Sequence, residues 1–231
     1  MRSDSKLILV EGLCGAGKST LSERLHYYLL RKGISSCFYD EGAKGHPASL
    51  NWHAFLREDD YTVLLERFPA EAGVIRSLTI REEGDFLIPY REVRSFEENA
   101  ELYAYLRSRE LCWTDTPVAT FLEFSSMIQR QWGRFAQLAG ASERVFVLEG
   151  VFFQHQIHDL LRHYQANDQQ IAQHIQGIAN QIAALHPRFI YLSEPNVREQ
   201  QIRIASIRSK PHFSTEANIQ FMDNRKRIEY S

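Results

Sequence analysis

The sequence predicts an α/β fold, a three-layer α/β/α domain with a mostly parallel sheet. The segment Lys6 to Val10 is a near-continuous apolar run, typical of a strand buried on both faces of a parallel sheet. A glycine-rich turn and a helical pattern follow this run, and helices alternate with short apolar strands again in the second half of the chain. The length of 231 residues fits a single domain of this class, residues 1–231.

Composition and charge exclude several classes of protein. Charged residues make up 24% of the chain, and 27 Lys and Arg against 29 Asp and Glu give a net charge of −2. These values argue against disorder and against a generally basic nucleic-acid coat, although a local basic site stays open. The apolar runs are too short for a signal peptide or a membrane span. We therefore expect a soluble protein with no nucleic-acid and no membrane partner.

Cysteine and histidine usage bears on compartment and metals. The chain holds three cysteines, Cys14, Cys37 and Cys112. Because their number is odd and no C-x-x-C spacing occurs, we expect neither a disulfide framework nor a zinc cluster, and a cytoplasmic location fits best. His53, His155 and His158 show no metal-ligand spacing supported by a second cluster, so we expect no transition metal.

The first elements form a βαβ unit. Lys18 to Lys32 has helical periodicity with leucines along one face, and Gly33 stands where a carboxyl-terminal cap belongs. Ser35 to Tyr39 is then a second short strand. Strand, turn, helix and strand follow one another as in a βαβ unit.

The second half of the chain repeats the alternation of helices and strands. Arg144 to Leu148 and Arg188 to Leu192 are predicted strands, each preceded by helical sequence. The helix before the first of them carries one apolar stripe, Phe121, Phe124, Ile128, Trp132 and Phe135. Asn167 to Leu185 is an amphipathic packing helix whose exposed side is a candidate homodimer surface. A last helix runs from about Asn196 to Ser209.

A different segment lies between the two halves. Val74 to Arg81 and Asp85 to Glu92 are strand-like and are separated by Glu82-Glu83-Gly84, which predicts an inserted β-hairpin. The hairpin is either a surface decoration or a wall over a substrate, and both interpretations stay open. We assign residues 43–113 to an insertion on the acceptor side.

The most specific motif is the turn after the first strand. Its residues are Gly12, Leu13, Cys14, Gly15, Ala16, Gly17, Lys18, Ser19 and Thr20, which match G-x-x-x-x-G-K-[ST]. Such a loop presents backbone N–H groups to a phosphate chain at a helix N-terminus, where the helix dipole favours anions. Lys18 would reach the β- and γ-phosphates of ATP, and the Ser19 hydroxyl would ligate Mg²⁺. The buried strand before it and the helix after it are the context that this function requires.

Acidic residues that follow two of the predicted strands are expected at the same sheet edge. Glu149 ends the apolar strand before Gly150, at the edge where ligands gather in open α/β sheets, and is our candidate for a Mg²⁺-linked carboxylate, directly or through water. Its alternative role is a cap or a salt bridge. Asp40 and Glu41 follow the second strand, where a carboxylate could accept a proton from an attacking hydroxyl. Ordinary turn chemistry is the alternative there, and Glu41 is the preferred candidate.

These residues together resemble a known family. Gly12 to Thr20, Asp40 to Gly42 and Arg144 to Gly150 are similar to the P-loop nucleoside and nucleotide kinases, with the thymidylate kinase branch closest. The resemblance implies that Glu41 acts as the base towards the acceptor and that Arg130, on a helix before the acidic strand end, steadies transferred charge.

The resemblance also extends to the segment after Tyr191. Residues 196–214 resemble the arginine-bearing lid that closes over the phosphates in such kinases, which implies that Arg203 and Arg208 neutralise charge on the transferring phosphoryl group. A solvated helix face is the alternative.

The sequence therefore predicts an ATP- and Mg²⁺-dependent kinase of a small-molecule acceptor. The acceptor would be a nucleoside, a nucleotide or a similar hydroxyl or phosphate compound. Two alternatives stay open: a regulatory protein that binds a nucleotide without transferring phosphate, and a kinase of an antibiotic or a sugar nucleotide.

Overall fold

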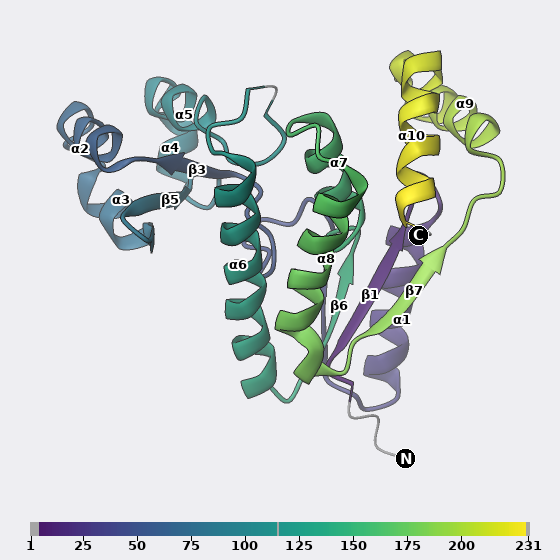
Figure 1. Cartoon of the computed structure of the whole chain (residues 1–231). Helices are drawn as coiled ribbons and strands as arrows, with labels where there is room; N and C mark the ends of the chain where they lie inside the picture. The colour runs from purple at the N-terminus through teal and green to yellow at the C-terminus, as the bar shows by residue number, and fades with distance from the viewer. Residues whose placement is uncertain (1–4, 115, 230–231) are drawn as a thin grey trace.

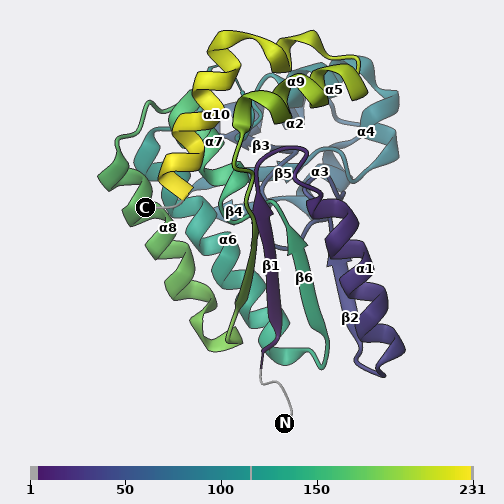
Figure 2. The ribbon, with the colours of Figure 1, turned by 90° about the vertical axis from the view of Figure 1, so that its right-hand side faces the viewer.

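A computed structural model describes residues 5–114 and 116–229, and its centre is a four-stranded parallel sheet with the order β2–β6–β1–β7 (Figures 1 and 2). The strands are β1 (Leu7–Gly12), β2 (Ser36–Tyr39), β6 (Val145–Glu149) and β7 (Arg188–Leu192). The parallel pairing of β1 with β6 sets Val10 opposite Glu149. The expected parallel sheet is confirmed, with strand ends within two residues of the prediction. Residues 1–4, which entered the signal-peptide argument, lie outside the described residues.

Helices cover both faces of this sheet. The first helix, α1 (Lys18–Arg31), contacts β1, β2 and β6 on one face, whereas α6 (Phe121–Ala141) and α8 (Asp168–Ile182) lie on the other (Figure 1). The short α7 (Gln154–Arg162) leads into α8, and the 3₁₀ turn η1 (Ala183–Leu185) follows it. Within the described residues, no helix is both long and apolar enough to cross a membrane.

The aromatic stripe of α6 forms much of the main core, as the spacing predicts. Trp132 is fully buried and makes edge-to-face contacts with Phe135 and Phe152, and Phe135 makes another with Phe146 of β6. Thr120 starts this helix with a capping box, in which its side chain and that of Glu123 each bond the other's backbone N–H. Aromatic packing and the cap together fix α6 against the sheet.

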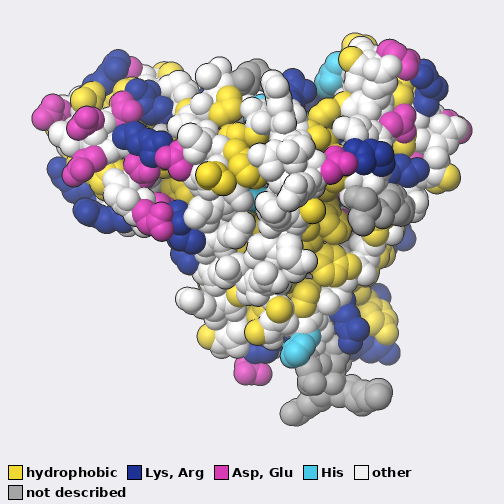
Figure 3. All heavy atoms as spheres, viewed as in Figure 1, with side chains coloured by type: hydrophobic (Ala, Val, Ile, Leu, Met, Phe, Trp, Pro, Cys, Tyr) yellow, Lys and Arg dark blue, Asp and Glu magenta, His cyan; other side chains and the backbone are white. Residues whose placement is uncertain are grey.

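A second, antiparallel sheet lies between β2 and α6 in the chain, at the left of Figure 1. Its strand order is β3–β5–β4, and its strands are β3 (His53–Leu56), β4 (Ile80–Glu82) and β5 (Asp85–Pro89). Four short helices surround it: α2 (Glu58–Arg67), α3 (Ala72–Leu78), α4 (Arg94–Glu98) and α5 (Ala100–Arg107). These elements share their own apolar cluster, in which Tyr61 stacks on Phe86 at 4.0 Å between ring centres. Charged side chains of both signs gather on the outside of this region (Figure 3).

The predicted hairpin is confirmed only in part. The β4–β5 pair and the turn through Glu83 and Gly84 are present, but the expected first strand was wrong, because Ala72–Leu78 is the helix α3. Ala72 and Ile75 are buried three residues apart, which is helical spacing, while Val74 between them is 40% exposed. The hairpin is also not a free decoration, because β5 pairs with β3 along its other edge.

The chain after β7 crosses the carboxyl end of the sheet (Figure 2). Its elements are α9 (Val197–Ile207), the 3₁₀ turn η2 (Pro211–Ser214) and α10 (Glu216–Glu229). The helix expected at Asn196 to Ser209 is confirmed within two residues. Val197 of α9 and Met222 of α10 form a small apolar cluster with Leu13, so both helices pack on the loop that follows β1.

One ion-pair cluster joins the small sheet to α6. Glu82 of β4 is buried, and its carboxylate binds Arg130 at 2.5 Å and also Arg134, both on α6. Arg130 also contacts the exposed Glu83 at 3.1 Å. Glu82 is far less exposed than its partners. Breaking the cluster would therefore destabilise the fold mainly by leaving the buried Glu82 carboxylate without a partner.

We expect Glu82→Gln to lower the free energy of unfolding by about 1–3 kcal/mol, since it removes the charge that binds both arginines. Glu83→Gln is the matched control, because Glu83 is exposed, and its effect should stay within about 0.5 kcal/mol. Urea denaturation of the two variants checks this. Equal losses in both variants would contradict the assigned role of Glu82.

Candidate active site

The glycine-rich loop Gly12–Thr20 connects β1 to α1 at the carboxyl edge of the sheet. Gly17 precedes α1 in a left-handed conformation, and within the described residues no side chain caps this helix end. Gly15 has a φ of 82°, and a Cβ placed on it would lie 2.3 Å from Cδ1 of Ile204 in α9. No described side chain therefore caps the backbone N–H groups at the N-terminus of α1, and α9 lies against the loop at Gly15.

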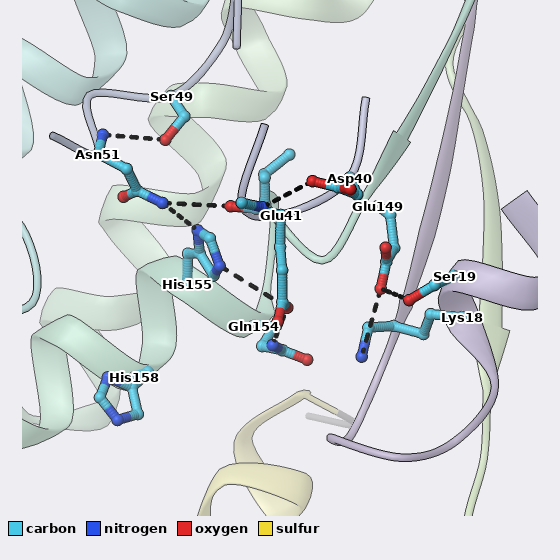
Figure 4. A network of polar contacts seen from close by, with 12 residues as sticks. Lys18, Ser19, Asp40, Glu41, Ser49, Asn51, Glu149, Gln154, His155 and His158 are labelled. Carbon is cyan, nitrogen blue, oxygen red and sulfur yellow. Dashed lines mark hydrogen bonds and ion pairs between the residues drawn. The ribbon is translucent and has the colours of Figure 1, made fainter. Parts of the chain in front are cut away.

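Lys18, Ser19 and Glu149 come together beneath this loop (Figure 4). The Ser19 hydroxyl donates to Oε1 of Glu149 at 3.0 Å, and Nζ of Lys18 lies 4.0 Å from the same oxygen. Lys18 also donates to the carbonyl oxygen of Leu13 at 3.2 Å, so its ammonium is folded back over the loop. The structure thus brings the predicted Mg²⁺-linked pair, Ser19 and Glu149, into direct contact.

The Glu149 carboxylate is in an unusual electrostatic position. Its residue is only 2% exposed, and burial raises its pKa, an effect that the nearby Lys18 ammonium opposes. Among the residues that the structure describes, its Oε2 atom has no hydrogen-bond partner. A buried carboxylate with a spare oxygen beside a serine hydroxyl fits a hard divalent cation such as Mg²⁺, which prefers oxygen ligands. Ser19 and Glu149 are therefore the residues that could hold this ion.

Glu41 lies across from this group and is held from α7 (Figure 4). Its Oε2 atom accepts a hydrogen bond from Nε2 of Gln154 and lies 3.8 Å from Nε2 of His155. Its side chain is 40% exposed, which leaves the carboxylate accessible. The neighbouring Asp40 instead accepts from the Gly42 backbone N–H at 2.9 Å, which is turn chemistry. The structure therefore places the Asp40 carboxylate in the turn and leaves the Glu41 carboxylate accessible, whereas the role of Glu41 as a base stays a prediction.

His155 is neutral beside Glu41. Its burial lowers its pKa to about 3. The Asn51 amide lies 3.2 Å from Nδ1 of the ring, and with this amide as the donor the ring proton is assigned to Nε2, on the side of Glu41. The side chains of Glu41 and Lys18 both lie close to the backbone at Gly150. A Cβ there would be 3.0 Å from the Glu41 carboxylate and 3.3 Å from Lys18, so glycine leaves room for both.

Glu11 is a part of the site that the sequence analysis missed. This buried residue accepts backbone hydrogen bonds from Phe152 at 2.9 Å and Gln154 at 3.1 Å, so it fixes the turn between β6 and α7. Burial raises its pKa to about 7. The available signal was a carboxylate inside an otherwise apolar strand, which is costly unless it is used. Gln154 and His155 were also missed, since nothing in their spacing points to Glu41.

A cavity of about 710 Å³ opens beside Glu41, between the glycine-rich loop, α7 and the carboxyl-terminal helices. Residues from all three parts line it, among them Cys14, Gln154, His158 and Arg208, together with Glu41 and Trp113. Arg208 therefore faces the same space as the candidate base. Arg203 is exposed on α9 and is not among the lining residues.

Arg130 is placed differently from the expectation. Its contacts are with Glu82 and Glu83 of the small sheet and with Ser126 of its own helix. These contacts place it between the small sheet and α6 rather than in the group around Lys18. Its role towards transferred charge stays a prediction.

No family model matches the chain, and no curated protein matches it. The functional assignment therefore rests on the residues and geometry of this chain.

We expect Glu11 to make stability depend on pH. Since its folded-state pKa is about 7 and its ordinary value is 4.5, the unfolded chain loses this proton first, and stability falls as the pH rises between these values. Over this pH interval, the free energy of unfolding should fall by up to about 3 kcal/mol less in Glu11→Gln than in the wild type.

Denaturation at several pH values measures this difference. Glu23→Gln, which removes an exposed carboxylate from α1, is the control and should leave the slope unchanged. Parallel curves for the wild type and Glu11→Gln would contradict the assignment.

Proposed function

We propose that this chain is an ATP- and Mg²⁺-dependent kinase of a small molecule, built on the P-loop NTPase fold. The observation that carries the proposal is the meeting of Lys18, Ser19 and Glu149 under a G-x-x-x-x-G-K-S-T loop at the carboxyl edge of a parallel sheet. A second, accessible carboxylate, Glu41, stands beside this group. A nucleotide-binding loop alone would not need that second acid.

The donor side uses the loop and the residues beneath it. The backbone N–H groups of the loop and of the α1 N-terminus would bind the phosphates of ATP. Lys18 would exchange its bond with the Leu13 carbonyl for one with the β- and γ-phosphates. Mg²⁺ held by Ser19 and Glu149 would supply positive charge next to the phosphate oxygens.

The acceptor side uses Glu41. Its carboxylate would take the proton from the acceptor hydroxyl as that oxygen forms a bond to the γ-phosphorus, and the bond from phosphorus to the β–γ bridging oxygen breaks to release ADP. Gln154 and neutral His155 orient the carboxylate without neutralising it. Arg208, from the wall of the same cavity, would steady charge on the phosphoryl group.

The cavity supports a planar acceptor. Trp113 stacks on His158 with 4.3 Å between ring centres, and both residues line the cavity. Flat aromatic surfaces of this kind suit a nucleobase or another ring system. A nucleoside or nucleotide is therefore the preferred acceptor class, and an antibiotic or sugar nucleotide is the alternative within the same chemistry.

One observation favours a regulatory alternative. Leu13 in the loop is buried together with Val197 of α9 and Met222 of α10, so the loop and the carboxyl-terminal helices form one packed unit. A nucleotide that moves the loop would move these helices, which is what a nucleotide-dependent switch requires. Measured phosphate transfer distinguishes the two functions.

We expect Glu41→Gln to lose about 10²- to 10⁴-fold in phosphoryl transfer, because it removes the base, while ATP binding stays within about twofold of the wild type. The assay incubates ATP and Mg²⁺ with a panel of nucleosides, nucleotides, antibiotics and sugar nucleotides, and detects ADP and the phosphorylated product by mass spectrometry. Asp40→Asn is the matched control, since Asp40 serves the turn, and it should keep most of the activity.

The kinase proposal fails if the wild type phosphorylates nothing in the panel although it binds ATP. In that case the regulatory alternative is favoured. Full activity of Glu41→Gln on an acceptor that the wild type phosphorylates would instead remove Glu41 from its assigned role.

A further inference from the structure

A second group of ligating side chains lies at the end of α7, separate from Glu149 and Ser19. His158 and Asp159 belong to the helix, and His163 follows its last residue. One nitrogen of each histidine and one carboxylate oxygen of Asp159 all lie within 4.8 Å of one another. Figure 4 shows His158 further along the helix that carries Gln154 and His155.

The distances within this group fit ligands of one metal ion. Oδ1 of Asp159 lies 3.4 Å from Nδ1 of His158 and 3.7 Å from Nε2 of His163. Both contacts are longer than a charge-assisted hydrogen bond of about 2.8 Å. They are close to the roughly 3.4 Å that separates two ligands at the corners of a tetrahedron around zinc, given metal–ligand bonds of about 2.1 Å. The three ligand atoms therefore lie close enough together to share one cation between them.

The surroundings of the group also suit a metal. Asp159 is 3% exposed, and the rings of Trp113 and Phe221 lie against His158, at 4.3 Å and 5.4 Å between ring centres. An aromatic shell of this kind holds a ligand in orientation and keeps water away from the other sides of the metal. His158 nevertheless lines the cavity described above, so the group lies at the wall of that cavity.

We propose that His158, Asp159 and His163 bind a divalent transition-metal ion, with Zn²⁺ the best fit. Two imidazoles and one carboxylate are a donor set of catalytic zinc sites, which keep a fourth position for water or substrate. The proposed Mg²⁺ ligands, Ser19 and Glu149, offer oxygen only, so the two sites select different ions. The zinc site would bind an oxygen or nitrogen atom of a molecule in the cavity, and it does not depend on the kinase proposal.

Histidine spacing alone predicts no transition metal in this chain. Adjacent residues such as His158 and Asp159 point in different directions on a regular helix, so their pairing is not a recognised ligand spacing. The site depends on the chain leaving the helix at His163, which returns a third ligand to the same carboxylate.

The test is a titration of the metal-free full chain with ZnCl₂ in excess Mg²⁺, followed by calorimetry, and a parallel titration with Co²⁺ followed by visible absorption. We expect one equivalent of Zn²⁺ to bind and Co²⁺ to give the absorption of a tetrahedral nitrogen and oxygen site. His158→Gln and His163→Gln should each weaken Zn²⁺ binding at least about tenfold. The two variants are made separately, so that either one reports if the other fails to fold.

Two control variants make the result specific. His186→Asn removes an exposed histidine whose φ of 49° suits asparagine, and it should bind Zn²⁺ as the wild type does. Cys14→Ser should also leave binding unchanged, and no thiolate-to-cobalt band should appear. The proposal is overturned if the wild type binds no Zn²⁺, if both glutamine variants bind it normally, or if Cys14→Ser abolishes binding.

Discussion

The arrangement at the sheet edge depends on one buried carboxylate, that of Glu149. Burying a negative charge is costly, and here the cost is offset by a serine hydroxyl at 3.0 Å and a lysine ammonium at 4.0 Å. Both partners come from the start of α1, whereas Glu149 ends β6. Parallel pairing of β1 with β6 sets Val10 opposite Glu149, and this register brings Glu149 to the start of α1, where Lys18 and Ser19 lie. A slip of one residue in this register would turn the carboxylate to the other face of the sheet.

The second acid of the site, Glu41, is connected to β1 through a series of hydrogen bonds. Glu11, next to the last residue of β1, accepts the N–H groups of Phe152 and Gln154 and thereby fixes the start of α7. The side chain of Gln154 then holds Glu41. The strand that leads into the glycine-rich loop thus also positions the proposed base, which would place the donor and acceptor sides of the proposed reaction on one rigid support.

Helices and strands that are defined by a pattern among neighbouring residues could be predicted from the sequence. The apolar run before Gly12, the leucine face of α1 and the aromatic stripe of α6 each identify an element from neighbouring residues. The contact of Ser19 with Glu149 was also predictable, because strand ends of a parallel sheet share one edge. The helix α3 was mistaken for a strand, since the β-branched Val74 and Ile75 favour strands while the buried spacing of Ala72 and Ile75 is helical.

Contacts between distant segments were not predictable in this way. The pairing of β5 with β3 and the binding of Arg130 by Glu82 join residues thirty or more positions apart, and no local pattern marks either. The convergence of His158 and His163 on Asp159 depends on where α7 ends, a boundary that periodicity does not fix to one residue.

In the proposed function, the loop and Glu149 form one site for a nucleotide with its magnesium ion. Calorimetry of a non-hydrolysable ATP analogue, with and without Mg²⁺, tests it most directly on the wild type and on Glu149→Gln. We expect Mg²⁺ to tighten binding about tenfold or more in the wild type and to have little effect in the variant, which keeps the loop but lacks the charge. Equal Mg²⁺ dependence in both proteins, or no binding of the analogue to the wild type, would contradict it.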